Sequence, residues 1–304
     1  MTVPLTAQRQ HNSMPAPAVV LELLKPVTWF PPMWAFTCGA VSSGQPIGAH
    51  RVAFFTGIVL TGPLVCAASQ AVNDWYDRHV DALNEPNRPI PSGRMPGTWG
   101  LRVAIGWTAL SLAVGATLGV RGIVCAIVAN ILSWAYSAPP VRLKRNGWWG
   151  NLAVGLSYEG LAWVAGAALL LAPAWPALPT LAMALLYSIG AHGIMTLNDF
   201  KSIEGDLRSG IRSLPAQLGA ARAGLVACAV MLVPQLVVIA LLLMWDRPWH
   251  AAGIAALTVG QLPLMRRMLE RPRERAAWYN GTGTTLFVLG MMVAAFALRG
   301  VGGG

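Results

Sequence analysis

The chain has 304 residues, of which 55% are hydrophobic and 11% are charged, and its formal net charge is +10. Soluble globular domains carry about 25% charged residues, so this composition excludes an ordinary soluble enzyme, a disordered chain and a fibrous protein. It is typical of a multi-pass membrane protein. The basic residues adjoin apolar stretches, which favours lipid headgroups over nucleic acid as their partner, and we predict no nucleic-acid binding.

Residues 1–25 are polar and rich in Pro and Ala, and we expect them to form a cytoplasmic segment ahead of the membrane domain. Apolar stretches then follow, most of them near the ~20 residues that cross a bilayer. They lie at residues 27–44, 52–72, 99–119, 122–137, 149–171, 178–197, 223–244, 250–265 and 281–298. The sequence therefore predicts an all-α membrane protein, with nine transmembrane helices in a bundle that form a single domain over residues 26–304.

The basic residues indicate the orientation of these spans. With nine spans and a cytoplasmic N-terminus, most of the 22 Lys and Arg residues fall in inside segments. The outside segments hold only Arg51, Arg121, Arg247 and Arg299. Because cytoplasmic loops carry an excess of Lys and Arg, we predict that the N-terminus is cytoplasmic and that the C-terminus lies outside.

Seven of the 12 acidic residues lie in two clusters, both on the predicted cytoplasmic side. The first cluster begins Asn73-Asp74 and the second begins Asn198-Asp199, and each has an Asp eight residues after its Asn. The two clusters are separated by four spans. Since four is an even number, both halves run in the same direction, which indicates a parallel repeat of four helices plus one extra helix.

The spacing within the clusters suits metal and diphosphate binding. If the second helix continues past the membrane surface, Asp74, Asp77 and Asp81 lie on one of its faces. Asp199, Ser202 and Asp206 repeat that spacing. Like charges so close together require a cation, and hard oxygen ligands suit Mg²⁺, which bridges carboxylates to substrate phosphates. A solvated acidic helix end would explain one such cluster but not two matching ones.

Basic residues accompany both clusters. Those that we assign to the binding of the diphosphate are Arg88, Arg142, Lys144, Lys201, Arg208 and Arg212. Carboxylates, Mg²⁺ and nearby guanidinium groups together form a site for a diphosphate. A diphosphate at a membrane cavity suggests a prenyl diphosphate, whose hydrocarbon tail lies among apolar helices and whose leaving group is stabilised electrostatically.

These residues resemble the UbiA superfamily of intramembrane prenyltransferases. The NDxxDxxxD pattern of that family is matched in full by Asn73, Asp74, Asp77 and Asp81. The resemblance covers nearly the whole chain and implies nine transmembrane helices around a central cavity, with two Asp-rich motifs on the cytoplasmic side. It implies Mg²⁺ ligands at both motifs, namely Asn73, Asp74, Asp77 and Asp81 at the first and Asn198, Asp199 and Asp206 at the second.

Within the superfamily, residues 73–94, 136–151 and 198–219 are similar to those of the (bacterio)chlorophyll synthases. This similarity implies transfer of a geranylgeranyl or phytyl group from its diphosphate to the propionate carboxylate of (bacterio)chlorophyllide. It also implies a bacterial inner membrane, cytoplasmic or photosynthetic intracytoplasmic, with the active site facing the cytoplasm and with pigment-pathway proteins as partners. Ser202 stands where many superfamily members carry an Asp, and Lys201 is expected to supply positive charge there.

The candidate site residues divide into two groups. The catalytic candidates are Asp74, Asp77, Asp81, Asp199 and Lys201. The substrate-binding candidates are Asn73, Arg88, Tyr136, Arg142, Lys144, Glu159, His192, Asn198, Arg208 and Arg212.

Glu159 and His192 lie inside apolar spans. An intramembrane carboxylate indicates a functional site, so we expect Glu159 to bind the acceptor or to pair with another helix. His192 precedes Asp199 by two helical turns, and it is a candidate to hydrogen-bond the substrate or to ligate the central Mg of the pigment. A hydrogen-bonded packing residue is the alternative for both.

Two other functional classes remain open at this point. One is a prenyltransferase with a different acceptor, an aromatic ring or haem, whose carbon prenylation would require a positioned base. The other is a cation transporter or a pigment-binding protein without chemistry. A transporter places its ionisable groups near the bilayer midplane, whereas here only Glu159 is deep in a span. Gly115 and Gly119 form a GxxxG pattern, which predicts close helix packing.

Overall fold

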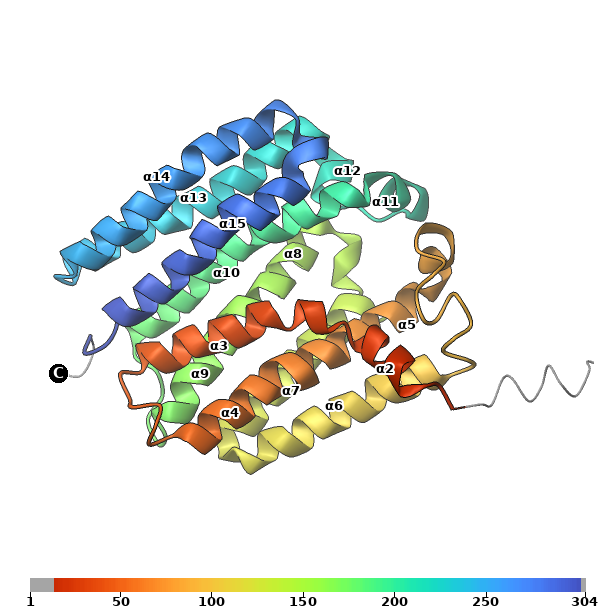
Figure 1. The fold of residues 1–304 in the computed structure, drawn as a ribbon, viewed down its shortest axis with the longest axis horizontal. Coiled ribbons are helices and arrows are strands. Elements are labelled where there is room, and N and C mark those ends of the chain that lie inside the picture. The colour runs from red at the N-terminus through yellow and green to blue at the C-terminus, as the bar shows by residue number, and fades with distance from the viewer. Residues whose placement is uncertain (1–13, 302–304) are drawn as a thin grey trace, which may run out of the picture. The chain divides into compact units, whose positions relative to one another are not determined.

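The computed structural model describes residues 14–301, and over that range it consists of helices joined by turns, with no β-strand. Every predicted apolar stretch lies on a helix (Figure 1). In chain order the helices are α2 (Pro17–Leu24), η1 (Pro26–Thr28), α3 (Phe30–Ser42), α4 (Arg51–Val59), η2 (Leu60–Cys66), α5 (Ala67–Asn84), α6 (Trp99–Thr117), α7 (Gly119–Ser137), η3 (Leu143–Arg145), α8 (Gly147–Gly155), η4 (Leu156–Leu161), α9 (Ala162–Leu170), α10 (Leu178–Asn198), η5 (Asp199–Lys201), α11 (Ile203–Ser209), α12 (Leu214–Leu218), α13 (Ala220–Met244), α14 (Pro248–Glu270) and α15 (Pro272–Ala297).

Within the described residues, 7 helices are long and apolar enough to cross a membrane. Three of these spans are continuous through more than one element: α4–η2–α5, α8–η4–α9 and α10–η5. The other two predicted spans correspond to α3, which has 13 residues, and to α14, which has 23 residues and carries Arg266 and Arg267. The prediction of a multi-pass helical membrane protein is therefore confirmed, and the count of nine spans stays a prediction.

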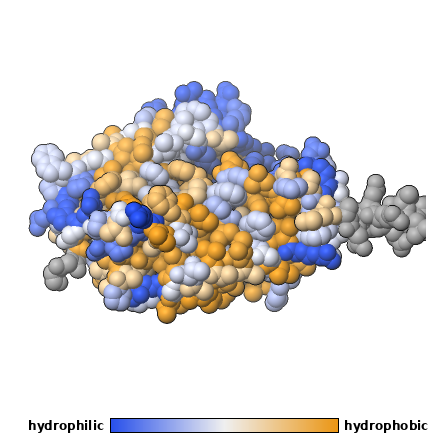
Figure 2. All heavy atoms as spheres, turned by 60° about the horizontal axis from the view of Figure 1, so that its bottom comes forward, coloured by the Kyte–Doolittle hydropathy of each residue, from blue (hydrophilic) through white to orange (hydrophobic). Residues whose placement is uncertain are grey.

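Large apolar side chains on these helices face outward. Val52, Phe55, Leu225 and Val259 each expose more than half of their surface. Orange, apolar side chains occupy much of the middle of the face that Figure 2 shows, and blue, hydrophilic ones gather toward its edges. Because a bilayer is an apolar solvent, such surfaces need no protein partner there, and they are expected on lipid-facing helices.

The described chain divides into two compact units. The first unit contains residues up to Pro31 and Val59–Arg142, and the second contains Pro32–Ile58 and Leu143 onwards. In the first unit, Leu23 and Leu24 of α2 are buried against Ala67, Ala71 and Val72 of α5. This packing attaches α2 to the helix that carries the first acidic motif.

In the second unit, α10 packs against α8, η4, α13 and α15. Gly155 of α8 allows the close approach of α10, because a Cβ there would lie 2.3 Å from the backbone oxygen of Ser188. Trp163 and Tyr187 are buried and stack with their ring centroids 5.7 Å apart. These contacts fix α10, which leads directly into the second acidic motif.

Helices α13 and α14 are joined by a buried polar network. Gln261 Nε2 donates to Gln235 Oε1 at 2.8 Å, and Thr258 Oγ1 donates to the same oxygen at 3.2 Å. We expect Gln261→Leu to lower the free energy of unfolding by about 1–2 kcal/mol, because Gln235 loses a donor in an apolar environment. Thermal unfolding in detergent measures this change. The exposed neighbour Leu262 is the matched control, and equal stabilities of Gln261→Leu and Leu262→Ala would contradict a structural role for the network.

The GxxxG prediction of close helix packing holds for Gly115 but not for Gly119. Gly119 lies beyond the end of α6 and is the first residue of α7, with φ +75°, a conformation that glycine adopts without strain. Gly115 does pack closely, but against Gly122 of α7, whose oxygen would lie 3.0 Å from a Cβ at Gly115. The close packing thus joins α6 to α7, the next helix of the chain, in a tight hairpin.

Candidate active site

The first acidic motif lies on α5, as its spacing predicts. The helix continues beyond the apolar stretch to Asn84, so that Asp74, Asp77 and Asp81 are all helical. Asp74 and Asp81 are buried and Asp77 is half-buried. His79, on the same helix, is exposed. Burying a charged carboxylate is costly unless a cation pairs with it.

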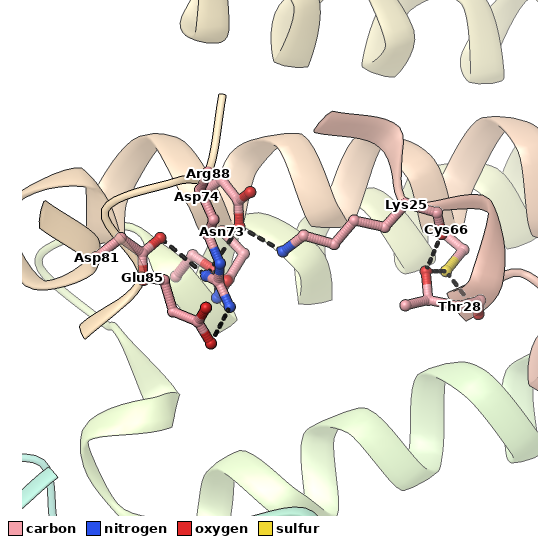
Figure 3. Close-up of polar contacts among 9 residues, drawn as sticks. Lys25, Thr28, Cys66, Asn73, Asp74, Asp81, Glu85 and Arg88 are labelled. Carbon is pink, nitrogen blue, oxygen red and sulfur yellow. Dashed lines mark hydrogen bonds and ion pairs between the residues drawn. The ribbon is translucent and has the colours of Figure 1, made fainter. Parts of the chain in front are cut away.

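Three cations provide this pairing, and two of them, Lys25 and Arg88, are drawn in Figure 3. Lys25 Nζ lies 2.6 Å from Asp74 Oδ1, and Arg88 Nη1 lies 2.9 Å from Asp81 Oδ2 and 3.5 Å from Asp74 Oδ1. Arg142 Nη2 lies 3.1 Å from Asp77 Oδ1. Each carboxylate of the first motif therefore has a positively charged partner.

The neighbouring carboxylates favour the charged form of Arg88. Burial by itself lowers the pKa of the guanidinium, but Asp74 and Asp81 raise it, and the net pKa lies above its ordinary value. The loop that carries Arg88 is anchored near its far end, where Arg94 forms two hydrogen bonds with the Glu22 carboxylate of α2. Arg94 holds the pKa of Glu22 below its ordinary value, mainly through this hydrogen bond.

Asn73 and Tyr136 complete the described part of the first site. Asn73 Nδ2 donates to Ser137 Oγ at 3.4 Å, which joins α5 to the end of α7. Tyr136 is half-buried at the same end of α7. The structure thus brings Asn73, the three aspartates, Arg88 and Arg142 together in the first unit, as the sequence analysis expects.

The second motif has a different local structure. Helix α10 ends at Asn198, a 3₁₀ turn spans Asp199–Lys201, and α11 starts only at Ile203. The idea that Asp199, Ser202 and Asp206 share one face of a continuous helix is therefore wrong. Ser202 Oγ donates to Asp206 Oδ2 at 3.1 Å, and such local side-chain bonds compete with helix continuation.

Neighbouring helices hold the polar groups of the second motif by hydrogen bonds. Asn151 Nδ2, on α8, donates to Asp199 Oδ2 at 3.1 Å and to Thr196 Oγ1 at 3.2 Å. Asn280 Nδ2, on α15, donates to Asn198 Oδ1 at 2.8 Å. Asp199 is half-buried and forms no ion pair within residues 14–301. Asp199 therefore has an amide partner where each first-motif aspartate has a cation.

Three of the basic candidates, Lys201, Arg208 and Arg212, lie within or shortly after this segment in the chain. Lys201, Arg208 and Arg212 are exposed, whereas Lys144 is buried. The backbone N–H of Arg212 donates to the carbonyl of Arg145 at 2.9 Å, and its own carbonyl accepts from Gly147 at 2.8 Å. This isolated bridge places the loop of Arg212 directly beside the loop of Lys144.

Glu159 and His192 are both buried within spans of the second unit. Glu159 lies on the π-helical stretch η4, and its carboxyl forms no hydrogen bond or ion pair with any described residue. His192 Nδ1 likewise has no hydrogen-bond partner there, and its ring lies 5.7 Å from that of Trp148. No described residue hydrogen-bonds the Glu159 carboxyl, whereas the backbone of Trp148 hydrogen-bonds His192, so the packing alternative stays open for the histidine. For Glu159, π-helical turns frequently mark functional sites.

Sequence reasoning missed three residues of these sites: Lys25, Asn151 and Asn280. Lys25 stands at the start of the first apolar stretch and is indistinguishable there from a topological charge. Asn151 and Asn280 are polar residues at or near apolar stretches, and polar residues within membrane segments tend to be functional. That signal singles out the asparagines but not the side chains that they contact.

The residues of the first motif fit a divalent cation that arrives with a diphosphate. Asp74 Oδ2 is buried and has no hydrogen-bond partner among the described residues. The lone pairs of this oxygen are therefore available to coordinate a metal ion. No three His, Cys, Asp or Glu side chains of the described residues form a metal site by themselves. Mg²⁺ does not need such a cage, because it commonly binds one or two carboxylates plus waters and substrate phosphates.

Comparison with known proteins identifies the family. The model of the UbiA prenyltransferase family matches residues 28–289. The chain is 55% identical to the Bacteriochlorophyll synthase 33 kDa chain of Rhodobacter capsulatus, over 95% of this chain and 96% of that protein. It is 37% identical to the chloroplastic chlorophyll synthase of Arabidopsis thaliana, over 91% of this chain and 73% of that protein.

A solved structure agrees with this at the level of the fold. The UbiA homolog from Archaeoglobus fulgidus bound to DMAPP and Mg²⁺ superposes with a TM-score of 0.68 at 22% identity, over 93% of this chain and 99% of that one. The fold, the family model and the sequence identities lead to one conclusion. The chain belongs to the UbiA prenyltransferase family.

Proposed function

We propose that this membrane prenyltransferase transfers a geranylgeranyl or phytyl group from its diphosphate to the propionate carboxylate of (bacterio)chlorophyllide. The observation that carries the proposal is the first motif, in which three carboxylates and three cations are assembled at the end of a membrane helix. The high identity to proteins named bacteriochlorophyll synthase supports the choice of a pigment acceptor.

The reaction forms one bond and breaks one. An oxygen of the acceptor propionate bonds to C1 of the prenyl group as the bond between C1 and the diphosphate oxygen breaks, and diphosphate leaves with the bonding electrons. A model carboxyl has a pKa of about 4, so the acceptor is already ionised at neutral pH and requires no general base. The main task of the protein is to neutralise the leaving group.

We assign that task to Mg²⁺ and the basic residues. When bound, Mg²⁺ would neutralise negative charge on the diphosphate, as it does in many phosphate sites. Asp74, Asp77 and Asp81 with Asn73 would hold it at the first motif, and Asn198, Asp199 and Asp206 at the second. The presence of DMAPP and Mg²⁺ in a solved relative supports this assignment.

The cations would hold the diphosphate itself. Arg88 and Arg142, already beside the carboxylates, present guanidinium groups that bind phosphate oxygens in pairs. Lys144, Lys201, Arg208 and Arg212 surround the second motif and would add positive charge there. The apolar side chains of the spans would contact the prenyl chain and exclude water from the reacting carbon.

Glu159 and His192 are proposed to contact the acceptor. Both are buried in membrane spans, and neither the Glu159 carboxyl nor His192 Nδ1 has a hydrogen-bond partner among the described residues. A neutral imidazole is a good ligand for the central Mg of a pigment, and Trp148 beside it offers a flat apolar surface. A buried carboxyl in lipid is expected to have a functional partner.

The membrane arrangement is proposed on the same basis. We infer nine spans, with α3 and α14 added to the 7 that meet the length and hydropathy criteria. They would form one domain over residues 26–304 around a central cavity, as a parallel four-helix repeat plus one helix. The N-terminus and the active site would face the cytoplasm of a bacterial inner membrane, either the cytoplasmic or the photosynthetic one, where pigment-pathway proteins would be its partners.

Purified protein tests this function directly. With Mg²⁺, geranylgeranyl diphosphate and bacteriochlorophyllide, we expect the pigment ester and diphosphate as products. Parallel reactions offer a hydroxybenzoate, homogentisate or haem in place of the pigment, and we expect none of them to be prenylated. Prenylation of one of these acceptors without pigment esterification would contradict the pigment assignment. Cation flux in liposomes without any prenyl diphosphate would favour a transporter.

A further inference from the structure

We propose that Lys25 is the resident counter-ion of Asp74, that it competes with the divalent metal for this carboxylate, and that it turns to the diphosphate when the metal binds. The proposal rests on the proposed function, because it concerns the same metal and donor. It adds a role for a residue that lies before the first span, outside both acidic motifs.

The contact between Lys25 and Asp74 is close and unequally buried. The distance from Nζ to Oδ1 is 2.6 Å, and the side chain of Asp74 is 2% exposed whereas that of Lys25 is 22% exposed. The second oxygen of Asp74 is buried without a hydrogen-bond partner among the described residues. Lys25 therefore satisfies one oxygen of the most buried carboxylate in the motif, and its amine points to that oxygen (Figure 3) from a side chain that is itself partly exposed.

The backbone shows that Lys25 is held in this position by its surroundings. Lys25 ends α2 in the left-handed conformation, with φ 47° and ψ 69°, although it is not a glycine and precedes Pro26. Non-glycine residues rarely adopt this conformation, and a following proline disfavours helical backbone. Thr28 stabilises the turn, because its N–H and Oγ1 donate to the carbonyl of Lys25 at 2.9 and 2.8 Å.

Three attachments hold α2 against the motif and so deliver the amine. Leu23 and Leu24 are buried against α5. Trp29 Nε1 donates to the carbonyl of Leu24 at 2.8 Å. Glu22 is paired with Arg94, in the loop that follows the motif. A single flexible lysine would not need such fixation to satisfy positive-inside topology, which any exposed basic residue satisfies.

The positive charge of Lys25 is expected to affect metal binding and donor binding in opposite directions. An ammonium group beside Asp74 repels a divalent cation at that carboxylate, so removing the charge should strengthen metal binding when no donor is present. The same ammonium group attracts a diphosphate, so its removal should weaken donor binding. A purely structural residue would change both in the same direction.

Mn²⁺ binding to the full-length protein in lipid nanodiscs tests the first effect, with free Mn²⁺ measured by electron paramagnetic resonance. For Lys25→Met we expect metal binding roughly tenfold tighter without donor, and binding of geranylgeranyl S-thiolodiphosphate in the presence of Mn²⁺ roughly tenfold weaker. Lys25→Arg should restore both. The matched control is Arg78→Met, which removes a charge from α5. Arg78 contacts Trp75 and forms no ion pair with a carboxylate among residues 14–301, so we expect less than about a threefold change in either binding constant.

The unmodified protein provides a second test that does not depend on folding of a variant. The sequence contains only three lysines, Lys25, Lys144 and Lys201, so amine labelling can be assigned by mass spectrometry. Relative to an added small-molecule amine, the labelling rate of Lys25 should rise with Mn²⁺ alone and fall when the thiolodiphosphate follows. A rate that Mn²⁺ leaves unchanged, or metal binding that weakens in a folded Lys25→Met protein, would overturn the proposal. Pigment esterification by the wild type is measured separately, and its absence would count against the proposed function instead.

Discussion

Asp77→Asn is expected to lower kcat for prenyl transfer by roughly 10²- to 10³-fold, with the fold intact. Asn keeps the shape of the side chain but removes the charge that binds the metal and balances Arg142, 3.1 Å away. Because Asp77 is half-buried and Asn can still accept a hydrogen bond from Arg142, thermal unfolding should change little. Ester formation from geranylgeranyl diphosphate and bacteriochlorophyllide measures the loss.

Glu85→Gln is the matched control for this prediction. Glu85 follows the same helix, also lies near Arg88 at 3.7 Å, and is 56% exposed. An exposed ion pair contributes about 0–1 kcal/mol, so activity should stay within about threefold of the wild type. Wild-type turnover by Asp77→Asn, or equal losses in the two variants, would remove the basis for a metal site at the first motif.

Asp199→Asn is expected to lower kcat by roughly 10- to 100-fold, less than the first-motif change, and to raise the Mg²⁺ concentration needed for half-maximal activity. Asp199 has an amide partner, Asn151, and the second motif carries Ser202 in the central position, so fewer charges act there. Titration of the esterification rate with Mg²⁺ measures both quantities.

Two further variants separate charge from position at Asp199. Asn151→Leu leaves the carboxylate in place but removes its 3.1 Å hydrogen bond, and it should cause a smaller loss in the same direction. Glu204→Gln changes an exposed acid in the same segment and should leave the Mg²⁺ titration unchanged. If Asp199→Asn has the same kcat and the same half-maximal Mg²⁺ concentration as the wild type, the second motif does not take part in metal binding.

The helices could be predicted because their signals are strong and local. Long apolar stretches bounded by basic loops gave the positions of the helices from α3 to α15 that carry them, and the i, i+3, i+7 spacing gave the first motif on α5. The segment of residues 73–94, on which the family resemblance partly rests, contains Asn73, the three aspartates and Arg88, which the structure brings together in the first unit.

What the sequence could not give depends on contacts between distant segments. The pairing of Lys25 with Asp74 joins residues on α2 and α5, and that of Asn280 with Asn198 joins α15 and α10. The break at Ser202 was missed for a different reason. The spacing of the second motif repeats that of the first, but the helix is interrupted at Ser202, whose side chain donates to Asp206. Such a side-chain hydrogen bond competes with helix formation, and residue spacing alone does not reveal it.

The central claim is that a divalent cation, held by the first motif, neutralises the leaving diphosphate. Electron–nuclear double resonance of protein-bound Mn²⁺ with geranylgeranyl S-thiolodiphosphate tests it most directly, because phosphorus within bonding distance couples to the metal. We predict a ³¹P coupling in the wild type that is lost in Asp77→Asn. Bound Mn²⁺ without any phosphorus coupling, or a coupling that persists unchanged in Asp77→Asn, would contradict the claim.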